Sequence, residues 1–254
     1  MTRAPAPLLV IVPAWNEEAT VGSTVLELRE VVPGADVLVV DDGSTDATGA
    51  RAAAAGAGVL TLPYNLGVGG AMRAGYRYAR RFGYERAVQV DADGQHDPRE
   101  IPRLLAGLER ADISIGSRFA DRGAYEVRGP RRWGMILLAV VVSRLAGTRL
   151  TDVTSGFRAT GRRGIEQYCR CYPTEYLGDT VDSLVVALRS GLTATQVGVH
   201  MRPRQGGTPS AHPVQAAGYL LRSLLALLMA LTRTPVRPED RGEPPVPGAR
   251  AARS

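Results

Sequence analysis

The sequence predicts an α/β fold built on a mostly parallel sheet that is flanked by helices. Two observations lead to this prediction. Short apolar runs alternate with stretches of helical periodicity throughout the first half of the chain. These runs are apolar on both faces, which is typical of parallel strands that helices cover on both sides. The 254 residues are enough for one large domain with appendages and for a substantial core.

The elements of the first half follow one another in a regular order. Residues 8–12 form an apolar run that Pro13 ends, so a strand is expected over 8–13. The further expected strands are 36–41, 59–63, 86–91 and 112–116, and the helices between them are 17–31, 46–55, 69–82 and 98–109.

The second half is less regular, with helices expected over 135–145 and 181–189 and a strand over 193–201. The apolar helix 135–145 fits a core position and contact with a membrane or lipid equally well.

Polar side chains follow the expected strands at one edge of the sheet. In parallel α/β sheets, ligands bind beyond the carboxyl ends of the strands. We therefore expect the functional site at this edge, which collects Asn16 and Glu17 after the first strand, Asp41 and Asp42 after the second, Asn65 after the third, and Asp91 and Asp93 after the fourth.

The most informative feature is the acidic stretch that follows the fourth strand. Residues two apart on a strand point to the same face, so Asp91 and Asp93 aim two carboxylates at one point. Converging carboxylates repel unless a cation lies between them, and hard ions such as Mg²⁺ or Mn²⁺ prefer oxygen ligands. Gln95 adds a neutral oxygen. The pattern indicates a metal–diphosphate site; the alternative is an acidic turn that caps the helix after Pro98.

A dinucleotide-binding fold is the rival at this level, and the sequence argues against it. That fold needs Gly-x-Gly-x-x-Gly directly after the first strand, where this chain has Ala14-Trp-Asn-Glu-Glu18. The glycine-rich Gly67-Val-Gly-Gly70 follows the third strand instead. It fits a backbone that approaches a phosphate or sugar and a simple helix cap about equally well.

The charge pattern points to anionic partners. The formal net charge is +6, and all 31 basic residues are Arg, which binds phosphate in bidentate fashion. Nucleotide phosphates, a lipid phosphate and an anionic membrane surface are therefore candidate partners. Nucleic acid is not expected, since no basic stripe is interleaved with aromatic residues and only 6% of residues are aromatic.

Two features indicate a cytoplasmic location. Cys169 and Cys171 lack the spacing and the further thiols of a zinc site, so they are expected to be ordinary thiols in a reducing compartment. The apolar run at residues 8–12 is too short for the core of a signal peptide. We therefore expect the catalytic part of the chain to lie in the cytoplasm.

The C-terminal part differs in composition from the rest. Residues 214–233 are apolar but contain Arg222, which is costly inside a bilayer, so we expect a helix that lies in the membrane interface or docks on a partner. Residues 234–254 are rich in Pro, Gly and charge and are expected to be disordered. The expected catalytic domain is 1–213.

Several motifs together resemble those of one enzyme family. They are Val12-Pro-Ala-Trp-Asn-Glu-Glu18, Asp41-Asp-Gly-Ser-Thr-Asp46, Asn65-Leu-Gly67, Asp91-Ala-Asp-Gly-Gln-His96, Gly116-Ser-Arg118 and Thr154-Ser-Gly-Phe-Arg158. Over roughly residues 8–213 the chain resembles family 2 glycosyltransferases of GT-A fold. Within them it is similar to dolichol-phosphate mannose synthases and related polyprenyl-phosphate glycosyltransferases.

The resemblance implies roles for individual residues. The donor nucleotide sugar would be bound by Pro13, Ala14, Asn16, Glu17, Asp42, Asn65, Gly67 and Asp91, and a Mg²⁺ or Mn²⁺ ion by Asp91, Asp93 and Gln95. The acceptor phosphate would be bound by Arg118, Arg131, Ser155 and Arg204, and the residues most directly involved in catalysis would be Asp93, Arg118, Arg204 and Asp179. Many relatives carry Ser-Lys at the end of the last Arg loop, where this chain has Pro209-Ser210, which removes one cation.

The resemblance also implies a reaction. It is the inverting, metal-dependent transfer of a hexose from GDP-mannose or a UDP-sugar to a polyprenyl phosphate. The protein would then be peripheral on the inner face of the plasma membrane, with the membrane surface or a small membrane protein as partner. Two alternatives stay open. One is transfer to a hydroxyl of a glycan or small molecule, with Asp179 as the base rather than a helix cap. The other is a non-catalytic protein that binds nucleotide sugars beside a membrane protein.

Overall fold

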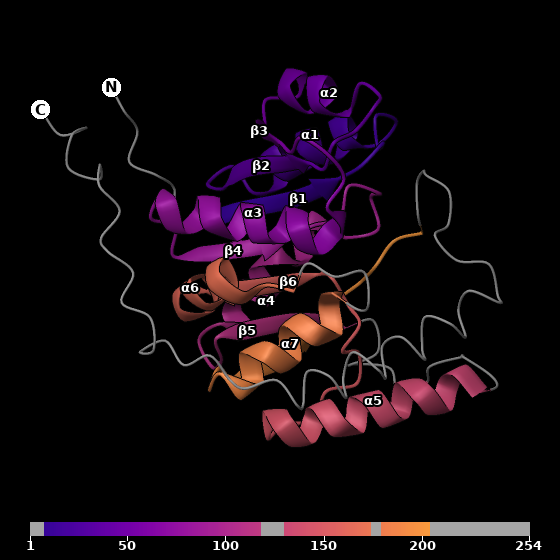
Figure 1. Ribbon diagram of the computed structural model, residues 1–254, viewed down its shortest axis with the longest axis vertical. Helices are drawn as coiled ribbons and strands as arrows, with labels where there is room; N and C mark the ends of the chain where they lie inside the picture. The colour runs from indigo at the N-terminus through magenta and orange to yellow at the C-terminus, as the bar shows by residue number, and fades with distance from the viewer. Residues whose placement is uncertain (1–7, 118–129, 174–178, 204–254) are drawn as a thin grey trace, which may run out of the picture.

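The computed structural model describes residues 8–117, 130–173 and 179–203 (Figure 1). Within these residues, seven strands form one sheet in the order β3-β2-β1-β4-β6-β5-β7. The strands are β1 (Leu8–Ala14), β2 (Asp36–Asp41), β3 (Gly58–Thr61), β4 (Arg86–Gln89), β5 (Ile113–Ser117), β6 (Arg158–Gly161) and β7 (Ala194–Gly198). The helices are α1 (Val21–Val31), α2 (Thr48–Ala54), α3 (Gly67–Arg81), η1 (Pro98–Glu100), α4 (Ile101–Gly107), α5 (Pro130–Ala146), α6 (Arg162–Cys171) and α7 (Asp179–Arg189).

The sheet is mostly parallel, as predicted. Strand β1 pairs in parallel with β2 and β4, β2 with β3, and β5 with β7. The exception is β6, which is antiparallel to both β4 and β5. Neither β6 nor the helix α6 after it is expected from the sequence, because the strand Arg158-Ala-Thr-Gly161 has no apolar run.

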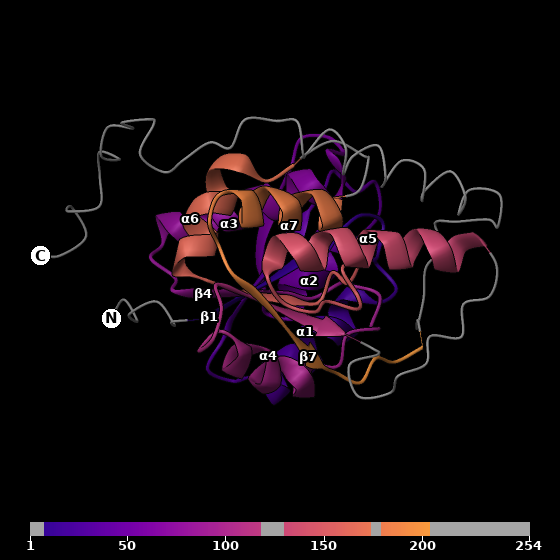
Figure 2. The same ribbon diagram turned by 90° about the horizontal axis from the view of Figure 1, so that it is seen from below.

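Helices lie on both faces of the sheet (Figure 2), and in the described part of the chain a hydrophobic core lies between the helices and the sheet on each face. On one face, α3 and α6 pack through Met72, Tyr76 and Tyr168, and residues of α5 and α7 complete the same cluster. On the other face, α1 and α4 contribute Val25 and Leu104, together with residues of α2. Helices on both faces bury the parallel strands and leave the carboxyl ends of β1 to β4 as the edge where polar groups gather.

Tertiary hydrogen bonds explain why α1 begins later than the predicted residue 17. Asn16 has a positive φ of 53°, which takes the chain out of helical geometry. The N–H of Glu17 donates to Thr48 Oγ1 at 2.8 Å and the N–H of Glu18 donates to Asp46 Oδ2 at 3.2 Å. Residues 17–20 therefore belong to the loop after β1 rather than to the helix.

The remaining boundaries differ from the predicted ones by a few residues. The strand predicted over 86–91 ends at Gln89, which places Asp91 in the turn that follows β4. The helix predicted over 98–109 is a 3₁₀ turn followed by α4. Asp97 caps that turn, since its side chain accepts from the N–H of Arg99 at 3.0 Å.

Helix α5 is longer than its predicted range of 135–145 and lies alongside α7 (Figures 1 and 2). Leu138 and Val142 are buried in the core, whereas Ile136 and Val140 are exposed. In the described part of the chain, no helix combines the length and the apolar content that a bilayer crossing requires. The predicted helix 214–233 and the predicted tail 234–254 lie outside the described residues.

Candidate active site

The loops after β1 and β2 are joined through Asn16. Its backbone N–H donates to Ser44 Oγ at 2.9 Å, and its Oδ1 accepts from the N–H of Thr45 at 2.9 Å. Asp41 also stabilises the loop after β2, because its Oδ1 accepts from the N–H of Ser44 at 3.0 Å. Asn16, which is predicted to bind the nucleotide sugar, therefore also holds in place the loop that would lie against that nucleotide sugar.

Asp42 joins the end of β2 to the loop after β3. Its backbone N–H donates to the carbonyl of Ala14 at 2.9 Å, and its Oδ1 accepts from the N–H of Leu66 at 2.8 Å. Burial raises the pKa of the Asp42 carboxyl; hydrogen bonds from the N–H groups of Leu66 and Gly67 oppose this, and the neighbouring Asp41 adds to it. The carboxyl is therefore buried against the loop after β3 and accepts hydrogen bonds from its backbone N–H groups.

The loop after β3 leads into the first turn of α3. Gly67 has a φ of +79°, a conformation that glycine adopts without strain, and its N–H donates to Asn65 Oδ1 at 3.0 Å. The glycine cluster thus serves as the start of a helix. Asn16, Asp42 and Asn65 all lie in connected loops at one edge of the sheet, as the strand-end argument predicts.

Asp46 orders the start of α2. It accepts hydrogen bonds from the N–H of Thr48, from the Thr48 hydroxyl and from the N–H of Glu18. Although partial burial opposes ionisation, these hydrogen bonds lower the pKa of Asp46 overall. The Glu17 carboxylate accepts from Thr20 Oγ1 at 3.1 Å, just before α1 begins. Asp46 and Glu17 therefore both stabilise the chain at the start of a helix.

The acidic turn after β4 holds Asp91 in a defined orientation. Gln89 Nε2 donates to Asp91 Oδ1 at 3.1 Å. The N–H of Asp91 donates to His96 Nδ1 at 3.0 Å, so Nδ1 acts as an acceptor and the ring proton is assigned to Nε2. His96 Nε2 lies 3.6 Å from Asp91 Oδ2. The His96 ring stacks on Phe157 at 4.6 Å between ring centroids. Because the Asp91 side chain is 40% exposed, it is oriented but open to a ligand.

Asp93 is the more buried of the two carboxylates. Its Oδ1 accepts from the N–H of Gln95 at 3.0 Å, and the carbonyl of Gln95 accepts from the N–H of Arg202 at 2.9 Å. The carbonyl between the two carboxylates, that of Ala92, accepts from Thr24 Oγ1 at 3.2 Å. The turn is therefore fixed from α1 on one side and from the segment after β7 on the other.

The donor chemistry of this turn fits a hard divalent ion. Asp91, Asp93 and Gln95 offer carboxylate and amide oxygens, which Mg²⁺ and Mn²⁺ prefer. Among the described residues, no group of three or more His, Cys, Asp or Glu is placed to hold an ion by itself. A site with one or two carboxylates suits Mg²⁺, which typically completes its coordination with water and substrate phosphates.

The segment Ser155-Gly156 lies against the acidic turn. A Cβ on Gly156 would stand 3.0 Å from Gln89 Nε2 and 3.3 Å from Asp91 Oδ2. Ser155, a predicted acceptor residue, is buried, and its Oγ accepts from the N–H of Phe157 at 3.3 Å. Ser155 therefore directly precedes a glycine whose backbone runs close to the side chains of Gln89 and Asp91.

A buried arginine supports this segment; it ends the motif Thr154-Ser-Gly-Phe-Arg158, but the sequence predicted no role for it. Arg158 is 3% exposed, and its guanidinium donates to the carbonyls of Val153, Ser155 and Thr180 at 2.8, 2.8 and 2.6 Å. These bonds tie the Ser155-Gly156 segment to the start of α7. An Arg that begins a short strand gives no sequence signal of this role, because its partners are backbone carbonyls.

Other predicted site residues are described only in part or not at all. Pro13 and Ala14 end β1 beside Val40 and Asp41 of β2. Arg131 lies in the first turn of α5 and Asp179 is the first residue of α7. Arg118 and Arg204 lie outside the described residues.

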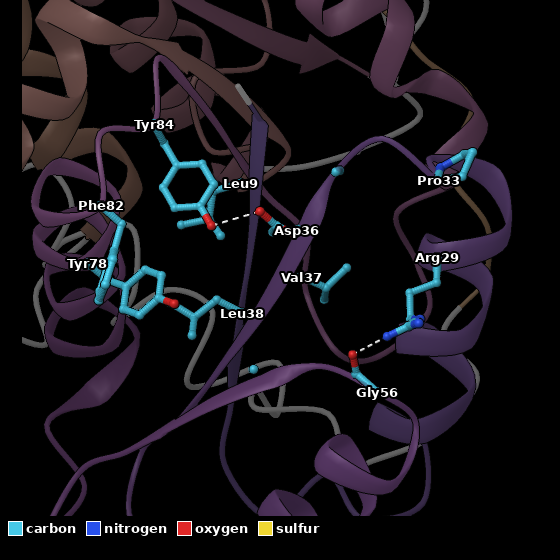
Figure 3. Close-up of a pocket in the computed structure, with 12 residues that line it drawn as sticks. Leu9, Arg29, Pro33, Asp36, Val37, Leu38, Gly56, Tyr78, Phe82 and Tyr84 are labelled. Atoms are coloured by element: carbon cyan, nitrogen blue, oxygen red, sulfur yellow. Dashed lines mark hydrogen bonds between the residues drawn. The ribbon is translucent and has the colours of Figure 1, made fainter. Parts of the chain in front are cut away.

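A cavity of about 650 Å³ lies at the opposite edge of the sheet (Figure 3). It is lined by residues from the amino ends of β1, β2 and β3 and by aromatic side chains at the end of α3. Tyr84 donates to Asp36 Oδ2 at 2.9 Å, and Arg29 donates to the carbonyl of Gly56. The cavity contains neither the acidic turn nor the loops after β1 to β3, so it is separate from the candidate active site.

Comparison with known proteins identifies the family of the chain. The sequence model described as Glycosyl transferase family 2 matches residues 9–169. Undecaprenyl-phosphate mannosyltransferase of Micrococcus luteus is 41% identical over 159 residues, which are 60% of this chain and 65% of that protein. Polyprenol monophosphomannose synthase of Mycolicibacterium smegmatis is 36% identical over 167 residues, which are 63% of each chain. The matched region thus spans a little under two thirds of the length of both relatives.

Solved structures support the fold. Glucosyl-3-phosphoglycerate synthase from Mycobacterium tuberculosis, in complex with Mn²⁺, uridine diphosphate and phosphoglyceric acid, is similar with a TM-score of 0.66 and 24% identity. The match covers 89% of this chain and 79% of that one. At this identity the likeness concerns the fold alone, and it confirms the predicted GT-A architecture.

Proposed function

This chain belongs to glycosyl transferase family 2, and we propose that it transfers a hexose from a nucleotide sugar to a polyprenyl phosphate. The observation that carries the proposal is the close approach of Gly156 to the acidic turn, where a Cβ on Gly156 would stand 3.3 Å from Asp91 Oδ2. Ser155 precedes Gly156 in the chain, so the segment that is predicted to bind the acceptor runs beside the residue that is predicted to face the metal and the diphosphate. The names of the two relatives favour mannose as the sugar, since both refer to mannose and a polyprenyl or undecaprenyl carrier.

The donor would lie across the carboxyl ends of β1 to β4. Asn16 and Asp42 hold the loops around this edge through their own hydrogen bonds, so the surface is formed before a nucleotide arrives. Asp91, oriented by Gln89 and His96, and Asp93, oriented by the N–H of Gln95, would hold Mg²⁺ or Mn²⁺. When bound, such an ion stabilises the negative charge that develops on the leaving nucleoside diphosphate.

The acceptor chemistry explains why no strong base is required. A phosphate monoester is already an anionic nucleophile, so positioning is the main task of the protein. Its oxygen attacks the anomeric carbon as the bond from that carbon to the nucleoside diphosphate breaks, and attack from the opposite side inverts the anomeric centre. Ser155 and the guanidinium groups of Arg118, Arg131 and Arg204 are proposed to bind the phosphate through charge-assisted hydrogen bonds.

We place this reaction at the inner face of the plasma membrane. The acceptor is a lipid, so the enzyme has to reach a bilayer surface. The apolar residues 214–233 are proposed to provide that contact, either directly in the headgroup region or through a small membrane protein.

A donor screen tests the proposal. Purified protein would be incubated with Mn²⁺ or Mg²⁺, a polyprenyl phosphate and a panel of GDP- and UDP-sugars, and lipid products would be detected by mass spectrometry. We expect a polyprenyl-phosphate hexose with at least one donor, no product in excess chelator, and near-complete loss of transfer in Asp93→Asn. Asp36→Asn, at the opposite edge of the sheet, is the matched control that should keep activity.

Undiminished turnover in excess EDTA would contradict the proposal that the reaction depends on a bound Mg²⁺ or Mn²⁺ ion. Transfer to a hydroxyl acceptor with none to polyprenyl phosphate would replace the proposed acceptor, and Asp179 would then be tested as the base.

A further inference from the structure

Arg158 is a buried cation whose hydrogen-bond partners in the described part of the chain are neutral. Its Nη1 donates to Ser183 Oγ at 3.3 Å as well as to the carbonyl of Thr180, while Nε and Nη2 donate to the carbonyls of Ser155 and Val153. Taking a guanidinium out of water is unfavourable unless hydrogen bonds replace those to water. The four acceptors surround one planar group, an arrangement that suits a guanidinium and not an ammonium.

Two of these bonds fix the chain just before Gly156. Val153 and Ser155 lie five and three residues before Arg158, so the guanidinium closes a turn of its own chain. The other two bonds hold this turn against the first turns of α7. An arginine that served only α7 would not need the two bonds within its own turn. Arg158 therefore sets the path of the chain through Gly156.

The chain that Arg158 holds reaches Asp91 by two routes. At Gly156 the backbone comes so close that a Cβ would stand 3.3 Å from Asp91 Oδ2. The ring of Phe157 stacks on His96 with 4.6 Å between ring centroids and 11° between the ring planes. His96 Nδ1 in turn accepts from the N–H of Asp91 at 3.0 Å. One route therefore leads to the carboxylate of Asp91, and the other leads through His96 to its backbone.

From these contacts we infer that Arg158 is a positioning residue for Asp91. Through Gly156 and Phe157 it keeps the Asp91 carboxylate in one orientation. The inference rests on the proposed function, because it takes Asp91 as a carboxylate that would hold Mg²⁺ or Mn²⁺. Replacing a residue that orients a metal ligand typically lowers the metal affinity by a factor of about 10–100. Loss of Arg158 should weaken metal binding more than nucleotide binding, since the loops after β1 and β2 have hydrogen bonds of their own.

Nucleotide binding at different Mn²⁺ concentrations tests this inference without turnover. The affinity for GDP or UDP, whichever the wild type binds more tightly, would be measured by calorimetry in excess EDTA and at increasing Mn²⁺ concentration. We expect Mn²⁺ to strengthen nucleotide binding by the wild type, and the Mn²⁺ requirement is the concentration that gives half of this gain. In Arg158→Gln the Mn²⁺ requirement should rise about tenfold or more, while the Kd in EDTA should change less than about threefold.

Further variants separate geometry from charge and from folding. Arg158→Lys keeps the positive charge, but its ammonium cannot serve four acceptors around a planar group, so it should recover only part of the loss. Ser183→Ala removes one acceptor of Arg158 and should raise the Mn²⁺ requirement about threefold. Arg163→Gln is the matched control, because Arg163 is exposed beyond the other end of β6, where it binds Asp112 and the carbonyl of Gly191.

Hydrogen–deuterium exchange distinguishes a local change from a general loss of stability. In Arg158→Gln, peptides covering 91–96 and 153–158 should exchange faster, because the segment and the acidic turn are no longer held together. Peptides of β2 and β3 should keep their wild-type rates. An arginine that only stabilised the fold would instead raise the exchange rates throughout the sheet when it is replaced.

A folded Arg158→Gln with the wild-type Mn²⁺ requirement would overturn the inference. Equal losses of nucleotide affinity in EDTA and in Mn²⁺, with faster exchange throughout the sheet, would overturn it as well. If neither Arg158 variant folds, a wild-type Mn²⁺ requirement in Ser183→Ala overturns it. A wild type whose nucleotide affinity does not respond to Mn²⁺ or Mg²⁺ would refute the metal site of the proposed function itself, and that failure is visible without any variant.

Discussion

Replacing Gly156 by Ala tests the link between the acidic turn and the acceptor segment. The added methyl group would stand 3.0 Å from Gln89 Nε2 and 3.3 Å from Asp91 Oδ2, which is closer than ordinary contact. Gln89 is buried and cannot swing away, whereas the Asp91 side chain is 40% exposed and can. We therefore expect Asp91 to be displaced by a few tenths of an ångström, with its hydrogen bond from Gln89 weakened.

The substitution should lower the catalytic efficiency more than it lowers the free energy of unfolding. Overpacking a rigid site costs about 1–3 kcal/mol, and we expect the lower end because Asp91 can move. The kcat/KM should fall about tenfold, equivalent to roughly 1.4 kcal/mol, and the activating Mn²⁺ concentration should rise. Gly161→Ala is the matched control, since its methyl would meet only the carbonyl of Asp112 at 3.5 Å. A Gly156→Ala enzyme with wild-type kcat/KM and metal dependence would refute the reasoning.

Three further predictions follow from the loops and from the opposite edge of the sheet. Asp46→Ala should lower the free energy of unfolding, measured in urea, by about 1 kcal/mol, and Asp46→Asn should lower it by less. Because folding lowers the pKa of Asp46 below 3.8, this difference in stability from wild type should vanish as the pH falls through the lowered pKa. Gly43→Ala should weaken nucleotide binding about tenfold in calorimetry, because its φ is +70° and its methyl would meet backbone at 2.7 Å, whereas Gly34→Ala, with open space around it, should not. Burial and the hydrogen bond to Asp36 raise the pKa of Tyr84 above 10, so stability should fall as the pH rises beyond about 10, and Tyr84→Phe should reduce that loss in alkaline unfolding. An unchanged alkaline profile in Tyr84→Phe, or equal effects of the two glycine variants, would contradict these predictions.

The sequence was sufficient to predict the edge of the sheet where the candidate site lies. Parallel strands end together, so the residues after β1, β2 and β3 had to gather, and Asn16, Asp42 and Asn65 do lie in connected loops. The prediction follows from strand period and topology alone, both of which apolar patterning reveals. The start of α1 could not be predicted in the same way, because tertiary hydrogen bonds to Thr48 and Asp46 remove residues 17–20 from the helix.

The part that sequence patterns could not predict depends on buried polar groups with distant partners. Strand β6 begins with Arg158, a residue type that is usually exposed, yet three backbone carbonyls accept its hydrogen bonds inside the fold. Arg202 donates to both carboxylate oxygens of Glu27, although the two residues are 175 residues apart and no local pattern connects them. In both cases the relevant energy comes from specific hydrogen bonds that exist only once the sheet has formed.

An acceptor competition tests the central claim most directly. Wild-type protein with Mn²⁺ and the active nucleotide sugar would receive equal amounts of a short polyprenyl phosphate, the matching polyprenol and phosphoglyceric acid, and the products would be separated and identified by mass. The account predicts a sugar on the polyprenyl phosphate alone, with the anomeric configuration inverted relative to the donor and no product for Asp93→Asn. Sugar transferred to the polyprenol or to phosphoglyceric acid, with none on the polyprenyl phosphate, would contradict it.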